Sequence, residues 1–209
     1  MSKVVGTNAF NQACTKVKDD ILVYFDAFVK AFGTPPMEVG LTDRALLMYK
    51  TLIPSLVLRQ TGIKEESQNG ADYVFELTIQ NPYGPLGTGI DVDFWIQAKC
   101  FRHLDRDHPV ADFCYINKSS GEYQMNILAK SIATADTKVK RAVGGYFVYG
   151  PDTIMYIPIT DLTKRFANLK ERNPGRGSDW YNTELSKFYW GARKQDYFIE
   201  SLITNIPPI

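Results

Sequence analysis

The chain has few of the residues from which metal clusters and disulfide frameworks are built. Its 209 residues include three cysteines and two histidines. The cysteines, Cys14, Cys100 and Cys114, are odd in number and widely spaced, which argues against a disulfide framework and against a cysteine-rich zinc site. His103 and His108 alone are too few for a histidine-based metal site. Metal sites ligated by cysteine or histidine are therefore disfavoured.

Long apolar runs and a net charge are also missing. No stretch approaches the roughly 18 to 20 apolar residues of a membrane span, and residues 1–6 lack the apolar run of a signal peptide. We therefore expect a cytoplasmic protein without a membrane partner. The 24 Lys and Arg residues balance the 23 Asp and Glu residues, so net charge gives no signature of nucleic-acid binding. The length and the hydrophobic content of 44% are typical of one globular domain, which we expect residues 1–209 to form.

Apolar spacing predicts two helices in the first quarter of the chain. Apolar residues recur every three or four positions over residues 10–32, which predicts a helix that Gly33 and the following prolines end. Thr42 is a suitable N-cap for a second helix, because an aspartate follows in the first turn. Pro54 is expected to kink or end that helix. Residues 64–70 are polar and precede the strand pattern, and Glu66 among them is expected at the end of a helix.

A strand pattern follows. Residues 71–80 are rich in Tyr, Val, Phe and Ile, and a loop rich in Gly and Pro separates them from the most regular strand, residues 90–101. Strict alternation places apolar side chains on one face of that strand, namely Ile90, Val92, Phe94, Ile96, Ala98 and Cys100. The other face carries Asp91, Asp93, Trp95, Gln97 and Lys99. One face is therefore predicted to be core, and the other to carry solvent-facing or functional side chains.

Further elements complete the prediction. A weak strand, a helix and two strands joined by a Gly-Pro-Asp turn are expected at residues 110–116, 122–135, 143–149 and 153–159. Residues 173–178 are typical of a loop, and the aromatic-rich residues 180–203 are compatible with strand, helix or both. This order predicts an α/β (α+β) fold with a central mixed β-sheet of about four or five strands flanked by helices. Its core spans about residues 38–160, and residues 161–209 form a C-terminal extension of uncertain structure.

The region around the most regular strand has the chemistry of metal-assisted phosphodiester hydrolysis. Mg²⁺ prefers oxygen ligands, and one or two carboxylates with waters and a phosphate are sufficient. Asp72 offers a carboxylate, and Gln97 and the Ala98 backbone carbonyl offer two neutral oxygens. Lys99 projects from the same face as Gln97, where its ammonium group can orient the attacking water and offset phosphoryl charge. Gly70 lets the chain enter the strand tightly and leaves room for a phosphate backbone.

The order of these residues resembles the PD-(D/E)xK nuclease superfamily, in a variant with Gln97 in place of the second acid. The likeness is closer to an uncharacterised bacterial family with a GAD…QAK…Q…YxFYN signature. Its motifs stand here as Glu38…Thr42, Glu66…Gly70-Ala71-Asp72, Ile96-Gln97-Ala98-Lys99, Tyr123-Gln124 and Gly145-Tyr146-Phe147-Val148-Tyr149. Gly150 stands where the signature has Asn. The resemblance covers residues 38–150.

The resemblance implies a restriction-endonuclease-like core of α-β-β-β-α-β type and cleavage of DNA that depends on Mg²⁺ or Mn²⁺. It implies that Asp72 and Gln97 bind the metal and that Lys99 is the catalytic lysine. Glu66 would be an auxiliary acid, and Gln124 would contact the lysine or the phosphate backbone. Small nucleases of this kind serve in phage defence or DNA repair, which is the role that the resemblance suggests.

Gln97 also favours an alternative to the function of an active nuclease. A neutral amide removes one negative charge from the site, so metal affinity is expected to be lower than with a carboxylate. The alternative is a catalytically inactive nuclease-fold module that binds nucleic acid or serves as a scaffold for a partner. RNA as the substrate, a protein partner that supplies targeting and a homodimer are all compatible with the same sequence.

Charge is unevenly distributed along the chain. Residues 138–194 carry 11 Lys and Arg against 5 Asp and Glu, a net charge of +6, with aromatic residues interleaved. Basic residues in this segment are candidates for contact with a nucleic-acid backbone, in particular Lys138, Lys140, Arg141 and Arg176. A solvated surface explains the segment equally well.

Other polar residues near the predicted site favour ordinary structural roles. Asp93 shares the face of Lys99, but at roughly 3.3 Å per residue it lies about 13 Å from Gln97, too far to share one ion. Asp93 is therefore interpreted as solvent-facing. His103 is interpreted as an ordinary loop histidine, and Trp95 as a residue that packs against a covering helix.

Overall fold

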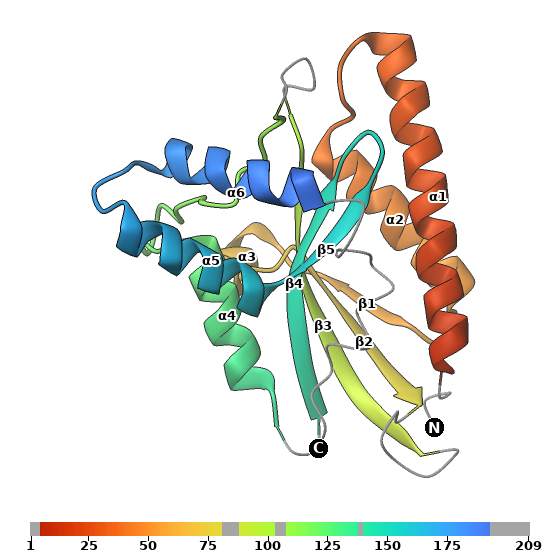
Figure 1. Ribbon diagram of the computed structural model, residues 1–209. Helices are drawn as coiled ribbons and strands as arrows, with labels where there is room; N and C mark the ends of the chain where they lie inside the picture. The colour runs from red at the N-terminus through yellow and green to blue at the C-terminus, as the bar shows by residue number, and fades with distance from the viewer. Residues whose placement is uncertain (1–4, 81–87, 103–107, 138–139, 193–209) are drawn as a thin grey trace.

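The computed structural model describes residues 5–80, 88–102, 108–137 and 140–192 (Figure 1). Five strands in these ranges form one sheet in the order β1-β2-β3-β4-β5. The bounds of β1 to β5 are Val57–Gln60, Tyr73–Gln80, Gly89–Cys100, Lys140–Tyr149 and Ile154–Pro158. β3 and β4 are parallel, and the other neighbouring strands are antiparallel. The prediction of a mixed sheet flanked by helices is therefore confirmed.

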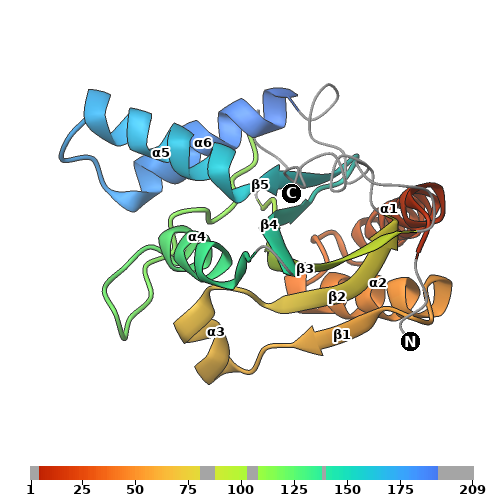
Figure 2. The same ribbon diagram turned by 90° about the horizontal axis from the view of Figure 1, so that it is seen from below.

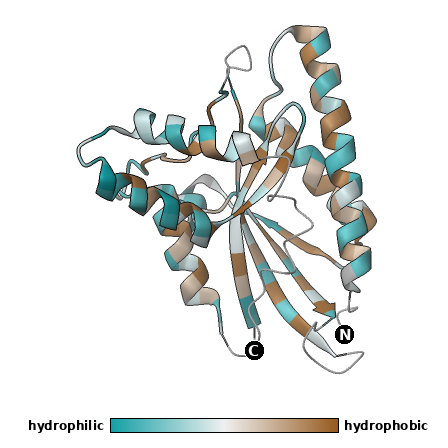
Figure 3. Ribbon diagram, viewed as in Figure 1, coloured by the Kyte–Doolittle hydropathy of each residue, from teal (hydrophilic) through white to brown (hydrophobic). Residues whose placement is uncertain are grey.

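Two long helices, α1 (Thr7–Phe32) and α2 (Glu38–Leu52), cover one face of the sheet (Figure 2). The apolar side of β3 packs beneath them. Phe94 stacks on Phe10 of α1 at 5.6 Å between ring centroids, and Ala98 lies in the same buried core. In Figure 3, hydrophobic and hydrophilic residues alternate along β3. The alternation predicted from the sequence is confirmed, and it leaves the opposite side of β3 for polar residues.

The other face of the sheet is covered by α4 (Gln124–Ala135), α5 (Ile159–Arg172) and α6 (Ser178–Ala192). One hydrophobic core joins these helices to β4 and β5, and its members include Leu128, Tyr146, Ile157, Phe166, Tyr181 and Tyr189. The described part of the expected C-terminal extension is thus two helices that share a core with the sheet. None of the helices in the described ranges is long and apolar enough to cross a membrane.

The second helix begins earlier than predicted. α2 starts at Glu38, after an extended Met37, rather than just after Thr42. The prolines at positions 35 and 36 restrict the backbone before them, and the helix begins soon after that restriction ends. The Thr42 hydroxyl donates to the Glu38 carbonyl oxygen at 2.9 Å instead of capping the helix. Glu38 is therefore in the first turn of α2, at one end of the helix.

Residues 110–116, predicted as a weak strand, do not form one. They make only isolated bridges to neighbouring segments. The Ala111 backbone N–H donates to Ser186 Oγ at 2.9 Å, and the Cys114 backbone N–H donates to Asn182 Oδ1 at 2.7 Å. Side-chain acceptors from α6 take the place of strand partners for this backbone.

The polar segment before β2 contains a short helix, α3 (Ile63–Asn69), which carries Glu66. It ends at Gly70, whose φ of +75° is in the left-handed region. A Cβ on Gly70 would lie 2.7 Å from the Leu128 backbone nitrogen and 2.8 Å from the Gln124 carbonyl oxygen. The space at Gly70 is therefore filled by α4, and the expected room for a phosphate backbone is absent there. This close approach brings Glu66 on α3 near α4.

Candidate active site

Asp72 and Gln97 meet where the start of β2 lies beside β3. Asp72 precedes β2, and its backbone N–H donates to the Ile96 carbonyl oxygen at 2.9 Å. Its Oδ2 accepts two hydrogen bonds, from Gln97 Nε2 at 2.6 Å and from the Ala98 backbone N–H at 2.6 Å. Strand pairing thus brings together the three residues predicted as metal ligands.

The Gln97 amide lies between the Asp72 carboxylate and the Ala98 carbonyl oxygen. Its Nε2 approaches the Ala98 carbonyl oxygen at 3.2 Å, in addition to its bond with Asp72. Its Oε1 is buried and has no hydrogen-bond partner in the described part of the chain. Leaving a buried acceptor unpaired costs about 1–3 kcal/mol. A half-turn of the amide exchanges its oxygen and nitrogen, which would place three oxygens together. One carboxylate and two neutral oxygens fit a hard divalent cation.

Lys99 follows Gln97 on the same side of β3. Its Nζ lies 5.9 Å from the centroid of the Tyr115 ring. The Lys99 charge lowers the pKa of the Asp72 carboxyl and that of the Glu38 carboxyl, against the larger effect of burial. Lys99 therefore acts electrostatically on the predicted ligand Asp72.

Glu66 and Gln124 pair across the junction of α3 and α4. Gln124 Nε2 donates to Glu66 Oε1 at 2.8 Å, and the Gln124 residue is 2% exposed. Gln124 Oε1 is buried and, within the described residues, has no hydrogen-bond partner. Gln124 therefore contacts the predicted auxiliary acid. Within the described residues the Gln124 side chain is hydrogen-bonded to Glu66 rather than to Lys99, and its expected contact with phosphate stays a prediction.

Glu38 belongs to the site, although the sequence analysis gave it no role. It lines a pocket of about 470 Å³ with Lys99 and a second pocket of about 240 Å³ with Glu66 and Asp72. Burial raises the pKa of the Glu38 carboxyl, while Lys99 and Arg102 lower it. The signals available in the sequence were its place in the family motif and the two prolines that precede it, which set the helix start.

Burial makes the Asp72 carboxylate unfavourable in its charged form. It raises the pKa of Asp72 to about 7, and the negative charges of Glu66 and Glu38 contribute to the rise. Lys99 and the hydrogen bond from the Ala98 backbone act in the opposite direction. A carboxyl group that titrates near neutral pH beside a lysine is typical of functional sites, and a bound cation would favour its charged form.

Two of the basic residues predicted to bind nucleic acid lie far from this site. Lys140 is opposite Asp91 in the β3–β4 register, roughly 26 Å along the sheet from Lys99 at about 3.3 Å per residue. Arg141 is buried and forms an ion pair at 2.7 Å with the aspartate that ends α4. Lys140 forms an ion pair with Asp93 at 2.8 Å. Both cations are therefore paired with carboxylates of the chain itself.

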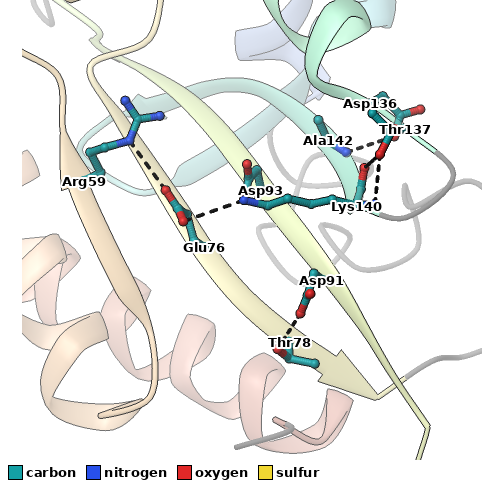
Figure 4. Close-up of polar contacts among 9 residues, drawn as sticks. All are labelled: Arg59, Glu76, Thr78, Asp91, Asp93, Asp136, Thr137, Lys140 and Ala142. Carbon is teal, nitrogen blue, oxygen red and sulfur yellow. Dashed lines mark hydrogen bonds and ion pairs between the residues drawn. The ribbon is translucent and has the colours of Figure 1, made fainter. Parts of the chain in front are cut away.

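Asp93 is 8% exposed, so the expectation that it faces solvent is wrong. Figure 4 shows the reason: Asp93 and Lys140 belong to a row of charged side chains that crosses the sheet. Lys140 also lies 3.7 Å from Glu76, which lies 3.5 Å from Arg59. The cationic side chains neutralise the partly buried carboxylates, as buried charges require.

The remaining candidates have separate locations. Lys138 and His103 lie outside the described residues. Arg176 lies between α5 and α6, with its guanidinium group 5.5 Å from the centroid of the Trp180 ring. Trp95 packs against the core under α4, which confirms the prediction of a packing role.

Within the described ranges, no three Asp, Glu, His or Cys side chains are close enough together to hold a metal ion. A cation at Asp72 would therefore depend on the oxygens of Gln97 and Ala98 and on water. Comparison of the chain with protein-family models and with curated proteins found no match. The resemblance to the PD-(D/E)xK nucleases therefore rests on the sequence motifs alone.

Proposed function

We propose that the chain is a PD-(D/E)xK-type nuclease that hydrolyses DNA phosphodiester bonds with Mg²⁺ or Mn²⁺. The observation that carries the proposal is the convergence of Asp72 and Ala98 on the Gln97 amide, with Lys99 next along β3. A buried carboxyl group with a raised pKa and an unpaired buried amide oxygen both destabilise the folded chain. Such unfavourable groups are typically retained where function requires them.

The order of the elements supports the same proposal. The sequence α2, β1, β2, β3, α4, β4 matches the α-β-β-β-α-β order of the superfamily, with α3 inserted between β1 and β2. β4 returns parallel to β3 after the α4 crossover. Asp72 adjoins the second strand, and Gln97 and Lys99 lie near the end of the third, as in the motif.

Each residue of the site has one role in this proposal. Asp72, Gln97 and the Ala98 carbonyl hold the divalent cation, which, when bound, polarises the scissile phosphate and lowers the pKa of a water molecule. Lys99 orients the attacking water and offsets the charge that develops on the phosphoryl oxygens. Glu38 lines the pocket of about 470 Å³ together with Lys99, and its negative charge attracts the Lys99 ammonium group and thereby positions it.

A second candidate function is a catalytically inactive module that binds nucleic acid. The observation that favours it is the hydrogen bond from Gln97 to Asp72, which satisfies the carboxylate without a metal ion. This candidate predicts DNA affinity that does not depend on Mg²⁺ and no binding of Mn²⁺ in calorimetry. The nuclease proposal predicts the opposite result for both measurements.

Cleavage of plasmid DNA and of labelled oligonucleotides, with Mg²⁺ or Mn²⁺, tests the proposed function. The wild type is expected to cut, and Lys99→Ala and Asp72→Ala are expected to reduce the rate at least 100-fold. Lys30→Ala and Asp26→Asn are matched controls, because these exposed residues pair with each other on α1, which covers the other face of the sheet. Cleavage at the wild-type rate by both site variants would contradict the assignment of the site.

A further inference from the structure

The larger of the two pockets at Glu38, about 470 Å³, lies between the end of β3, residues 110–116 and the first turns of α6. We call it the Tyr115 pocket, and its lining includes Glu38, Lys99, Arg102, Asp112, Tyr115 and Asp179. Its volume is within the range of roughly 300–1,000 Å³ that is typical of sites for small organic groups. Because it adjoins Lys99, a group bound in it would lie next to the proposed site of cleavage.

One wall of the Tyr115 pocket is aromatic and apolar. Tyr115 is 39% exposed and the adjacent Ile116 is 41% exposed. The Lys99 Nζ lies 5.9 Å from the Tyr115 ring centroid, so the ring borders the ammonium group that would contact the scissile phosphate. Nucleic-acid bases stack on exposed aromatic rings, and each stacked base strengthens binding roughly 5- to 150-fold.

The charges of the Tyr115 pocket are divided between its two sides. Lys99 and Arg102 are cationic and lie at and just beyond the end of β3, where they outnumber the neighbouring carboxylate of Glu38. By contrast, Asp112 and Asp179 are anionic and lie beside and on α6. A phosphate is attracted to the cationic side and repelled from the anionic side. A base has no net charge, and its N–H groups can donate to carboxylates. The charges therefore favour a nucleotide with its phosphate toward Lys99 and its base toward α6.

The walls of the Tyr115 pocket are held in place by α4 and α6. The Gln124 backbone N–H donates to the Tyr115 carbonyl oxygen at 2.9 Å. Asn182 of α6 accepts from the Cys114 backbone N–H at 2.7 Å and donates through Nδ2 to Asp112 Oδ1 at 2.9 Å. These bonds fix the Tyr115 backbone relative to the start of α4 and to α6, which lowers the entropy cost of binding.

We propose that the Tyr115 pocket binds the base of an unpaired nucleotide next to the scissile phosphate. This inference rests on the proposed nuclease function and gives the substrate class: single-stranded DNA, or duplex DNA with a nucleotide outside the stack. A paired base inside a duplex cannot enter a pocket unless it is extruded, at an unstacking cost. Fully paired duplex DNA is therefore expected to be the poorer substrate.

A binding measurement tests this proposal separately from catalysis. The probe is a labelled duplex with one unpaired thymidine, compared with the same duplex carrying an abasic residue at that position. Fluorescence anisotropy is recorded with wild-type protein in Ca²⁺, after gels show that the DNA stays intact. We expect the abasic probe to bind roughly 5- to 150-fold more weakly. Tyr115→Ala should bring the ratio of the affinities for the two probes close to one, and Tyr115→Phe should preserve the wild-type ratio.

Phe188→Ala is the matched control, because Phe188 is a similarly exposed aromatic residue on α6 that lies under Arg165 and does not line the Tyr115 pocket. Phe188→Ala should preserve the ratio of the affinities for the thymidine probe and the abasic probe. Equal affinity of wild type for the two probes, or a preference for the base that persists in Tyr115→Ala, would overturn the assignment of the pocket while leaving the nuclease proposal intact. Failure to bind any DNA probe would overturn the proposed function as well.

Discussion

The Gln97 amide donates to the Asp72 carboxylate across 2.6 Å, at the position where the superfamily motif has a second acid. Two facing carboxylates would repel each other in the absence of a cation. Gln97 instead supplies N–H donors to Asp72 and to the Ala98 carbonyl oxygen, which holds these groups together without metal. If this site binds a metal ion as proposed, the ion would displace this hydrogen bond, and the affinity for metal is expected to be lower than in a site with two acids.

Gln97→Glu should raise the affinity for Mn²⁺ on the order of tenfold, because it adds a negative charge to the ligand set. Isothermal titration calorimetry measures this change. A variant that cuts DNA when the wild type does not would identify the wild type as an inactive module. A variant that loses the wild-type cleavage would identify a working amide site. Unchanged Mn²⁺ affinity would show that Gln97 is not next to the metal.

Asp72→Asn should stabilise the chain more at pH 8 than at pH 5. The pKa of Asp72 is raised from 3.8 to about 7, so its contribution to folding is most favourable below pH 3.8 and is lost as pH rises toward 7. The asparagine side chain does not ionise, so its contribution to folding does not change over this pH range. The free energy of unfolding of the variant relative to wild type is expected to rise by about 1–3 kcal/mol between pH 5 and pH 8.

Urea denaturation at the two pH values measures this difference, with metal removed by EDTA. Asp26→Asn, at an exposed position on α1, is the control. A difference between Asp72→Asn and wild type that is constant from pH 5 to pH 8 would contradict the raised pKa.

Glu38→Gln should lower the pKa of Asp72, because the Glu38 charge contributes to its rise. It should also reduce cleavage by about ten- to 100-fold, since the Lys99 ammonium loses its carboxylate neighbour in the pocket. NMR titration of the Asp72 carboxyl carbon follows the pKa, and the pH profile of cleavage should shift in the same direction. A slower reaction with an unchanged pH profile would leave Glu38 with a structural role only.

Glu66 and Gln124 should be energetically coupled. A hydrogen bond between an amide and a charged carboxylate contributes about 1.5–3 kcal/mol, and Gln124 Nε2 donates to Glu66 at 2.8 Å. A double-mutant cycle with Glu66→Ala and Gln124→Ala, read from the free energy of unfolding, should therefore give a coupling energy of at least about 1 kcal/mol. Strictly additive losses would mean that the bond contributes nothing to α3–α4 packing.

The sheet and the main site residues could be predicted because each depends on a local pattern. The alternation along β3 fixes which face carries Gln97 and Lys99, whatever covers the strand. The helix α5 was not predicted, and α6 was left open between strand and helix, because buried aromatic residues such as Phe166 and Tyr189 suit strands as well as helices. Only packing against β4 and β5 decides between the two.

Charge along the chain was a poor guide to the surface. Lys140 and Arg141 count as positive charges in the sequence, but carboxylates from β3 and from the end of α4 pair with them in the fold. Asp93 was placed in solvent because it is too far from Gln97 to share an ion, and its actual partner Lys140 is remote in sequence. The role of Glu38 likewise depends on α2 reaching the end of β3, which the sequence pattern does not show.

The most direct test of the metal site is a crystal of the protein soaked in Mn²⁺, with anomalous diffraction recorded at the manganese edge. The nuclease proposal predicts one strong peak between Asp72, Gln97 and the Ala98 carbonyl, with the Gln97 amide turned so that Oε1 faces the ion. No peak at saturating Mn²⁺, with Gln97 Nε2 still bonded to Asp72, would contradict it.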